Sequence, residues 1–340
     1  QDGSSASNIA RLDYTNGSCP SILVEPQRTN LALQSSSFDS SGWGKSSMSV
    51  TANSTISPSG VVDADTITAS STFNNILQGV SVLASTTYTF SFWVLRGTMT
   101  DLKYSIYNVS GTSNIISPTT YYSQTNSSTW TRIVVTFTTP VGCTLINIYP
   151  IRDTGVIGTV FLWGAQLEAG SNATSYIPTT TTAVTRNADV ISKSGVSDLI
   201  GQTEGTLFID FNFTKTTDIY RRVFAISDGT SNNSISINLT ATGSSLEVYV
   251  FNGGITQVAF LTNILTANTR YKIAVGYVAN NVVLYINGTL RNTDLNCTIP
   301  TCSGVYLGKV ENASQTAFLN DSINSAMLFK TRLTNTELAT

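Results

Sequence analysis

The chain has 340 residues, of which 41% are hydrophobic and only 11% are charged, and its formal net charge is −2. No cluster of Lys or Arg marks a nucleic-acid site, no apolar run approaches the roughly 18 residues of a membrane span, and without histidine the chain cannot build Ser-His-Asp or Cys-His catalysis. The scarcity of charge disfavours surface helices and favours short strands joined by polar turns, so the predicted fold class is all-β with very little helix.

Residues 1–34 are predicted to form an irregular lead-in. Pro20 and Pro26 interrupt any regular element, whereas Leu23, Val24 and Leu31 need a core to cover them. We expect this lead-in to pack against the first folded domain.

Residues 35–175 contain many short apolar runs separated by turn clusters, which is typical of an antiparallel β-sandwich. The run from Tyr88 to Leu95 is apolar on both faces at its end, which predicts a central strand covered on each side. The run from Arg132 to Thr138 alternates and predicts a further strand.

A Thr-rich stretch without apolar periodicity, residues 176–193, is predicted to link two domains. The strand pattern resumes in residues 194–340, most clearly between Tyr271 and Leu290. There Asn280-Asn281 and Asn287-Gly288 predict two tight turns, because Asn and Gly tolerate positive φ. The architecture expected is therefore two tandem antiparallel β-sandwiches.

Two separated motifs are the most specific signal. They are VEPQRTNL, within residues 13–33, and WGAQLEAGSNATSYIPT, from Trp163 to Thr179, followed by TRNAD. Together they resemble a module of bacteriophage tail-fibre and other virion-surface proteins. That resemblance implies a jelly-roll sandwich like a carbohydrate-binding module, and residues 194–340 resemble a laminin-G or concanavalin-A-like domain.

The resemblance implies a non-catalytic fibre protein of the virion surface, attached to a tail or a capsid, that binds host surface glycans. It also implies contact with other virion proteins and a homotrimer. Three alternatives stay open: a capsid-decoration or fibre-spacer protein, an envelope-polysaccharide depolymerase, and a bacterial surface lectin.

Sugars are usually bound by stacking on exposed aromatic rings, with polar groups alongside. Aromatic residues in polar surroundings are therefore the candidate glycan-binding residues: Phe73, Tyr104, Tyr107, Tyr121 and Tyr122. The tryptophans lie in apolar runs or at packing positions of the family pattern, and we expect them to pack in cores: Trp43, Trp93, Trp130 and Trp163.

Glu25 and Glu168 lie in the two motifs, where they either form a catalytic pair or accept structural hydrogen bonds, and the second reading is favoured. No cofactor is implied apart from a structural calcium ion, for which Asp228 and Asn232 are weak candidate ligands. The alternative is that these two residues form a plain surface turn. Cys297 and Cys302 either close a small disulfide loop or remain two buried thiols.

Overall fold

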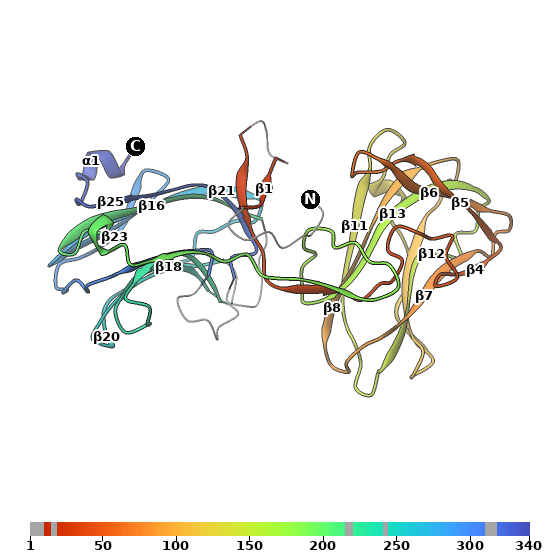
Figure 1. The fold of residues 1–340 in the computed structure, drawn as a ribbon, viewed down its shortest axis with the longest axis horizontal. Coiled ribbons are helices and arrows are strands. Elements are labelled where there is room, and N and C mark those ends of the chain that lie inside the picture. Colours follow the sequence, from red (N-terminus) through yellow and green to blue (C-terminus); the bar gives the residue numbers. More distant parts are fainter. Residues whose placement is uncertain (1–9, 15–18, 215–219, 241–243, 310–317) are drawn as a thin grey trace. The chain divides into compact units, whose positions relative to one another are not determined.

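The computed structural model describes residues 10–14, 19–214, 220–240, 244–309 and 318–340, and it divides into two compact units (Figure 1). Among the described residues, unit 1 comprises residues 27–187, and unit 2 comprises residues 10–26 together with residues 188–340. Unit 1 is thus inserted into the sequence of unit 2. Both units are built from antiparallel sheets, which confirms the predicted all-β class.

Unit 1 packs two five-stranded sheets face to face. In spatial order, the first sheet contains β10 (Ser113–Thr120), β9 (Lys103–Asn108), β12 (Leu145–Arg152), β7 (Asn75–Ser81) and β4 (Gly44–Ser46). The second contains β11 (Thr131–Thr138), β8 (Thr87–Arg96), β13 (Gly158–Ala169), β6 (Val62–Ala69) and β5 (Met48–Ile56).

Strand β8 has the central position predicted for it, because it pairs with β11 on one side and with β13 on the other. Its alternate residues Tyr88, Phe90, Phe92 and Val94 point into the core of unit 1 and are buried. The period of two in the sequence therefore set which face of the strand lies inside.

Unit 2 packs a seven-stranded sheet against a six-stranded sheet. The first contains β1 (Leu12–Asp13), β2 (Ser21–Val24), β25 (Asp321–Phe329), β16 (Glu204–Phe213), β21 (Thr269–Val278), β22 (Asn281–Ile286) and β23 (Thr289–Asp294). The second contains β15 (Ile191–Ser194), β24 (Gly304–Leu307), β17 (Arg221–Ser227), β18 (Ser234–Leu239), β19 (Leu246–Asn252) and β20 (Ile255–Thr262).

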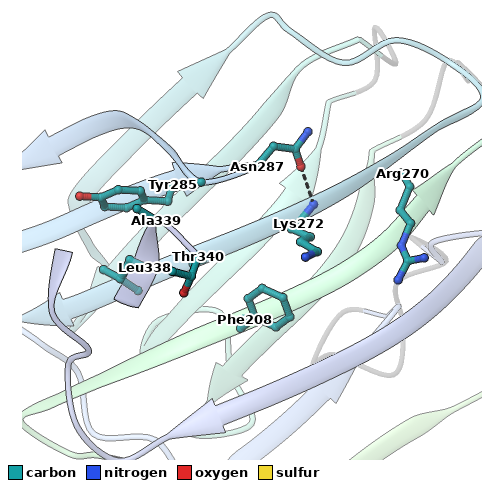
Figure 2. A pocket seen from close by; sticks show the side chains of 10 residues that line it. Phe208, Arg270, Lys272, Tyr285, Asn287, Leu338, Ala339 and Thr340 are labelled. Atoms are coloured by element: carbon teal, nitrogen blue, oxygen red, sulfur yellow. Dashed lines mark hydrogen bonds between the residues drawn. The ribbon is translucent and has the colours of Figure 1, made fainter. Parts of the chain in front are cut away.

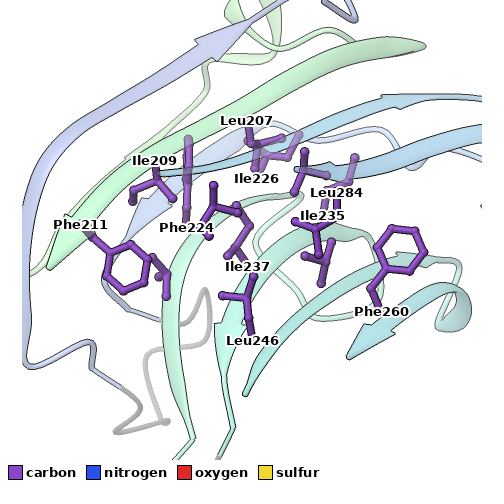
Figure 3. Close-up of a cluster of buried hydrophobic side chains, with 14 of the residues drawn as sticks. Leu207, Ile209, Phe211, Phe224, Ile226, Ile235, Ile237, Leu246, Phe260 and Leu284 are labelled. Atoms are coloured by element: carbon purple, nitrogen blue, oxygen red, sulfur yellow. The ribbon is translucent and has the colours of Figure 1, made fainter. Parts of the chain in front are cut away.

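The core of unit 2 is filled from both sheets, with Leu207 and Phe211 of β16 facing Phe224 and Ile237 of the other sheet (Figure 3). The two predicted tight turns are confirmed, because Asn280 has φ 57° and joins β21 to β22, while Asn287 and Gly288, with φ 48° and 74°, join β22 to β23. The short helix α1 (Asn335–Leu338) begins at a Thr334–Glu337 capping box.

The prediction that the whole lead-in packs on the first sandwich is wrong. Ile22 pairs with Ile323 and Val24 with Asp321, so β2 joins β25 in the larger sheet of unit 2, and β1 forms the edge of that sheet beside β2. Val24 is fully buried in that core, which explains why this apolar segment joins unit 2.

The predicted linker also differs from the structure. Ile177 is buried, and β14 (Val184–Arg186) pairs with β3 (Arg28–Asn30), so residues 176–187 belong to unit 1. The sequence of this segment does not show that it belongs to unit 1. It is held there by long-range hydrogen bonds, and it has no apolar periodicity of its own.

The two places where the chain passes between the units are tied together within unit 2. Arg11 donates from Nε to Asp189 at 2.8 Å and from a terminal nitrogen to Glu25 at 2.9 Å. The backbone N–H of Asp189 donates to the carbonyl of Glu25 at 2.9 Å, and the N–H of Glu25 donates to the Asp189 carboxylate at 2.8 Å. This cluster fixes both ends of the insertion at one point of unit 2.

The four cysteines, all within the described residues, are free thiols, and Cys143, Cys297 and Cys302 are buried. Of the two readings for Cys297 and Cys302, the structure therefore has the buried thiols, and burial raises the pKa of Cys302 to about 12. No helix in the described part of the chain is long and apolar enough to span a membrane.

Candidate functional site

Asn30, from the first motif, is a structural residue at the centre of unit 1. Its side chain is fully buried and uses all four of its hydrogen-bonding positions. Nδ2 donates to the carbonyls of Ala165 at 3.1 Å and Ile177 at 2.8 Å, and Oδ1 accepts from the backbone N–H groups of Ala32 and Leu167, each at 3.0 Å. One side chain therefore ties the first motif to both parts of the second.

Glu168, from the second motif, has the structural role predicted for it. It is fully buried, accepts from the backbone N–H and hydroxyl of Thr174 at 2.9 and 3.1 Å, and receives a short hydrogen bond from Gln166. The guanidinium of Arg28 lies 3.8 Å away. Burial raises the pKa of Glu168, opposed by Arg132, by the Gln166 hydrogen bond, by Arg28 and by Thr174.

Replacing Glu168 by glutamine is expected to destabilise unit 1 by about 1–3 kcal/mol, since the new amide nitrogen would face donors that now have an acceptor. Gln166 cannot turn to compensate, because its own carbonyl oxygen accepts from Ile177 N at 2.7 Å. A raised carboxyl pKa gives stability that is lost as pH rises from the unfolded value of 4.5, so the cost of the substitution should be larger at pH 5 than at pH 7. Urea unfolding at both pH values measures this. Asp39→Asn, at an exposed carboxylate of the same unit, is the control, and equal costs at the two pH values would contradict the assignment.

The two motif carboxylates do not form a catalytic pair within a unit. Glu25 lies in unit 2, where it binds Arg11, whereas Glu168 lies in the interior of unit 1. The motifs are therefore accounted for by packing and hydrogen bonding, and the functional surface has to be sought elsewhere.

One outward face of the first sheet of unit 1 gathers aromatic and polar side chains. Tyr107 of β9 pairs with Asn147 of β12, and Ser105 pairs with Tyr149. The guanidinium carbon of Arg152 lies 4.5 Å from the ring centre of Tyr149 and 5.4 Å from that of Tyr107. We call the surface formed by Tyr107, Asn114, Asn147 and Arg152, with Ser105 and Tyr149 buried beneath it, the Tyr107 face.

Arg152 is held in place over these two rings. One of its terminal nitrogens donates to the Ser105 hydroxyl and to the Asn114 amide oxygen, each at 3.0 Å, and its Nε lies 3.6 Å from the carboxylate of Asp153. A planar guanidinium fixed over aromatic rings is a preorganised cation–π arrangement. Ring faces, an amide and a cation are the groups that recognise the apolar face and the hydroxyls of a sugar.

Tyr107 is the candidate residue that lies on this face. Tyr104 points to the opposite side of the same strand and stacks inside unit 1 on Tyr121, with ring centres 6.0 Å apart. Tyr122 is half-buried beneath the guanidinium of Arg96, which lies 4.6 Å from its ring centre.

Tyr121 does not have the predicted exposed ring. It is completely buried, its hydroxyl donates to the carbonyl of Pro150 at 2.9 Å, and burial raises its pKa. The polar residues around it in sequence come from an exposed edge strand and loop, whereas Tyr121 itself turns inward at the strand end. Phe73 is 77% exposed on the loop between β6 and β7, and it takes part in none of the ring pairs of the described residues.

The four tryptophans, which were expected to pack in cores, are buried to different degrees. Trp43 is buried against Phe38, and Trp163 is buried against Tyr176 with ring centres 4.4 Å apart. Trp93 and Trp130 are half-buried.

Asp228 is one of the two calcium candidates, and both oxygens of its carboxylate accept hydrogen bonds from residues of its own turn. One carboxylate oxygen accepts from the N–H and hydroxyl of Thr230 at 2.8 and 2.7 Å, and the other accepts from Asn233 at 2.8 Å. Partial burial opposes ionisation, but these bonds outweigh it and lower the pKa of Asp228. Asn232 is exposed beside it, and the described residues contain no group of three or more acidic or cysteine side chains suited to a metal ion. The arrangement is that of a surface turn.

Tyr149, Asn147 and Arg152 were missed in the sequence. The alternation of Ile146 and Ile148 was visible and would have placed Asn147 and Tyr149 outward, but it would have placed Arg152 inward. A register shift between Ile148 and Ile151, at Pro150, reverses the phase and turns Arg152 outward.

No family model and no curated protein matches the chain. Solved structures give partial likenesses to sialidase carbohydrate-binding modules. The CBM40 module of the Ruminococcus gnavus IT-sialidase is 16% identical over 44% of this chain and 96% of the module, with a TM-score of 0.36, and the same module bound to α2,3-sialyllactose gives 0.37. NanB sialidase from Streptococcus pneumoniae is 18% identical over 44% of this chain and 26% of its own, with a TM-score of 0.37. Likenesses of this size carry no argument about a ligand.

Proposed function

We propose that this chain is a non-catalytic glycan-binding fibre protein of a bacteriophage surface, attached to a tail or a capsid. In this proposal unit 1 contacts host-envelope glycans through the Tyr107 face. The observation that carries the proposal is the fixed Arg152 guanidinium over Tyr107 and Tyr149, with two amide side chains alongside. The phage setting rests on the resemblance of the two motifs.

The Tyr107 face is suited to weak glycan binding, with adhesion arising from several copies of the face acting together. Tyr149 is almost completely covered, while Tyr107, Asn147 and Arg152 are half-buried and Asn114 is exposed. A ring contact contributes roughly 1 kcal/mol beyond its buried area, so a single face is expected to bind a glycan at about millimolar concentration. In a homotrimer attached to the particle together with other virion proteins, many such faces act together and raise the overall affinity by orders of magnitude.

The proposal predicts retention of polysaccharide without cleavage. Purified chain, biotinylated and clustered on streptavidin beads, should retain host-envelope polysaccharide, and size-exclusion chromatography should find the polysaccharide at its original length after prolonged incubation. Monomeric chain at the same total concentration should retain much less, because avidity is lost.

Shortened polysaccharide would contradict the proposal and support a depolymerase. If the clustered chain retains no host glycan, and particles lacking the chain adsorb normally, the adhesive role fails and the capsid-decoration role takes its place.

A further inference from the structure

Unit 2 has a cavity of ≈ 360 Å³ on the outward face of its seven-stranded sheet (Figure 2). This volume lies at the lower end of the roughly 300–1,000 Å³ found for small-molecule sites. Strand pairing brings Phe208 of β16, Ala274 of β21 and Tyr285 of β22 into one row across the sheet, and Asp210 lies opposite Lys272 in the next row. The cavity is therefore built on rigid strands.

The cavity has one cation whose charge is not balanced by a partner. Arg270 is held by Asp210 through two hydrogen bonds of 2.7 Å, so its charge is compensated. Lys272 is exposed, and its ammonium group has no ion-pair partner among the described residues. In Figure 2 its side chain lies between Asn287 and Phe208.

An amide donor accompanies this charge, and apolar side chains complete the cavity. Asn287 uses its amide oxygen to accept from the backbone N–H of Lys272 at 2.8 Å, which orients the side chain and leaves the amide nitrogen as a donor. Tyr285 lies at the opposite side of the cavity, where its ring packs with Ala274 and Leu338. Phe208 supplies an apolar surface on β16, on the other side of β21 from Tyr285.

The wall formed by the segment after β25 is firmly attached. Leu338 is buried on Ala274, Val283 and Tyr285, and α1 is capped reciprocally by Thr334 and Glu337. Gly288 approaches the backbone of Ala339 so closely that a Cβ there would lie 2.5 Å from its carbonyl oxygen. The cavity is thus a feature of the folded unit with little freedom to collapse.

We propose that this cavity is a second binding site, specific for a sugar that carries a carboxylate. The carboxylate would pair with Lys272 and accept from the Asn287 amide, while the sugar ring would lie over Phe208. A neutral sugar would leave the ammonium group without a counter-charge and would lose a charge-assisted hydrogen bond. The site lies in unit 2, so the inference does not depend on the Tyr107 face.

A matched pair of probes tests the charge requirement. Methyl β-glucuronide and methyl β-glucoside differ in the carboxylate that replaces one hydroxymethyl group. Titrated into isotope-labelled full chain, the glucuronide should shift the amide signals of Phe208, Lys272 and Asn287 and should bind roughly tenfold more tightly than the glucoside. One molar salt should weaken this preference, because the charges are near solvent.

Two lysine variants test whether the preference for the glucuronide comes from this cavity or from another part of the chain. Lys272→Met should abolish the preference for the glucuronide while leaving the fold intact, whereas Lys193→Met, at another exposed lysine of unit 2, should keep it. Equal affinity for the two probes, shifts confined to residues outside the cavity, or an unchanged preference in Lys272→Met would each overturn the proposal. The preference is measured from the amide signals of Phe208 and Asn287, which lie in unit 2, so a loss of binding at the Tyr107 face would leave it unchanged and the two proposals can be rejected separately.

Discussion

Replacing Asn30 by alanine should destabilise unit 1 by roughly 3–5 kcal/mol, the largest stability effect we expect from a single substitution in this unit. Four buried backbone groups, two carbonyls and two N–H groups, would lose their partner at once. Each unsatisfied buried group costs about 1–3 kcal/mol, and relaxation keeps the total below the simple sum.

Tryptophan fluorescence during urea unfolding measures this effect in unit 1 alone, because all four tryptophans of the chain lie there. Asn187→Ala, the same substitution at an exposed position of unit 1, should change the unfolding free energy by less than about 0.5 kcal/mol. If the two variants unfold alike, Asn30 does not hold the two motifs together.

Local patterns in the sequence predicted the strands and turns well, for a physical reason. A strand such as β8 shows its buried face as a period of two, and a tight turn such as Asn287-Gly288 needs residues that accept positive φ. Both features depend on neighbours in the chain, so they can be read without knowing the rest of the fold.

The organisation of the two units depends on distant partners and could not be read in this way. β2 looks like part of an irregular lead-in until its partner β25, about 300 residues later, is known. The sequence favoured a structural role for Glu168 but did not single out Asn30. Only the buried hydrogen bonds of these two residues identify their distant partners.

The candidate site was found in part. Tyr107 lies on a regular strand in polar surroundings, and its outward position follows from the alternation of β9. Tyr121 was misplaced because polar neighbours in sequence do not ensure exposure at the end of a strand. Arg152 was missed because a bulge, which leaves no periodic signal, turns it outward.

Replacing Arg152 by alanine should have the largest effect on binding. It removes the cation that lies over Tyr107 and Tyr149 and that engages Asn114. We expect at least a tenfold loss of affinity for each face, or about 1.4 kcal/mol. In a multivalent assembly the losses multiply, so retention of polysaccharide by the clustered chain should be almost abolished.

A matched arginine controls for general effects of this substitution. Arg96 also lies over a tyrosine ring, that of Tyr122, but on β8 of the other sheet of unit 1. Arg96→Ala should therefore bind as the wild type does, and so should Phe73→Ala, which removes an exposed ring outside the Tyr107 face.

The most direct test of the glycan-binding account is the retention of host-envelope polysaccharide by the wild type, Arg152→Ala, Arg96→Ala and Phe73→Ala, each clustered on beads and each shown to be folded by tryptophan fluorescence. The account predicts that Arg152→Ala alone loses retention. Full retention by Arg152→Ala, or loss only in Phe73→Ala, would contradict the assignment of the Tyr107 face as the glycan-binding site.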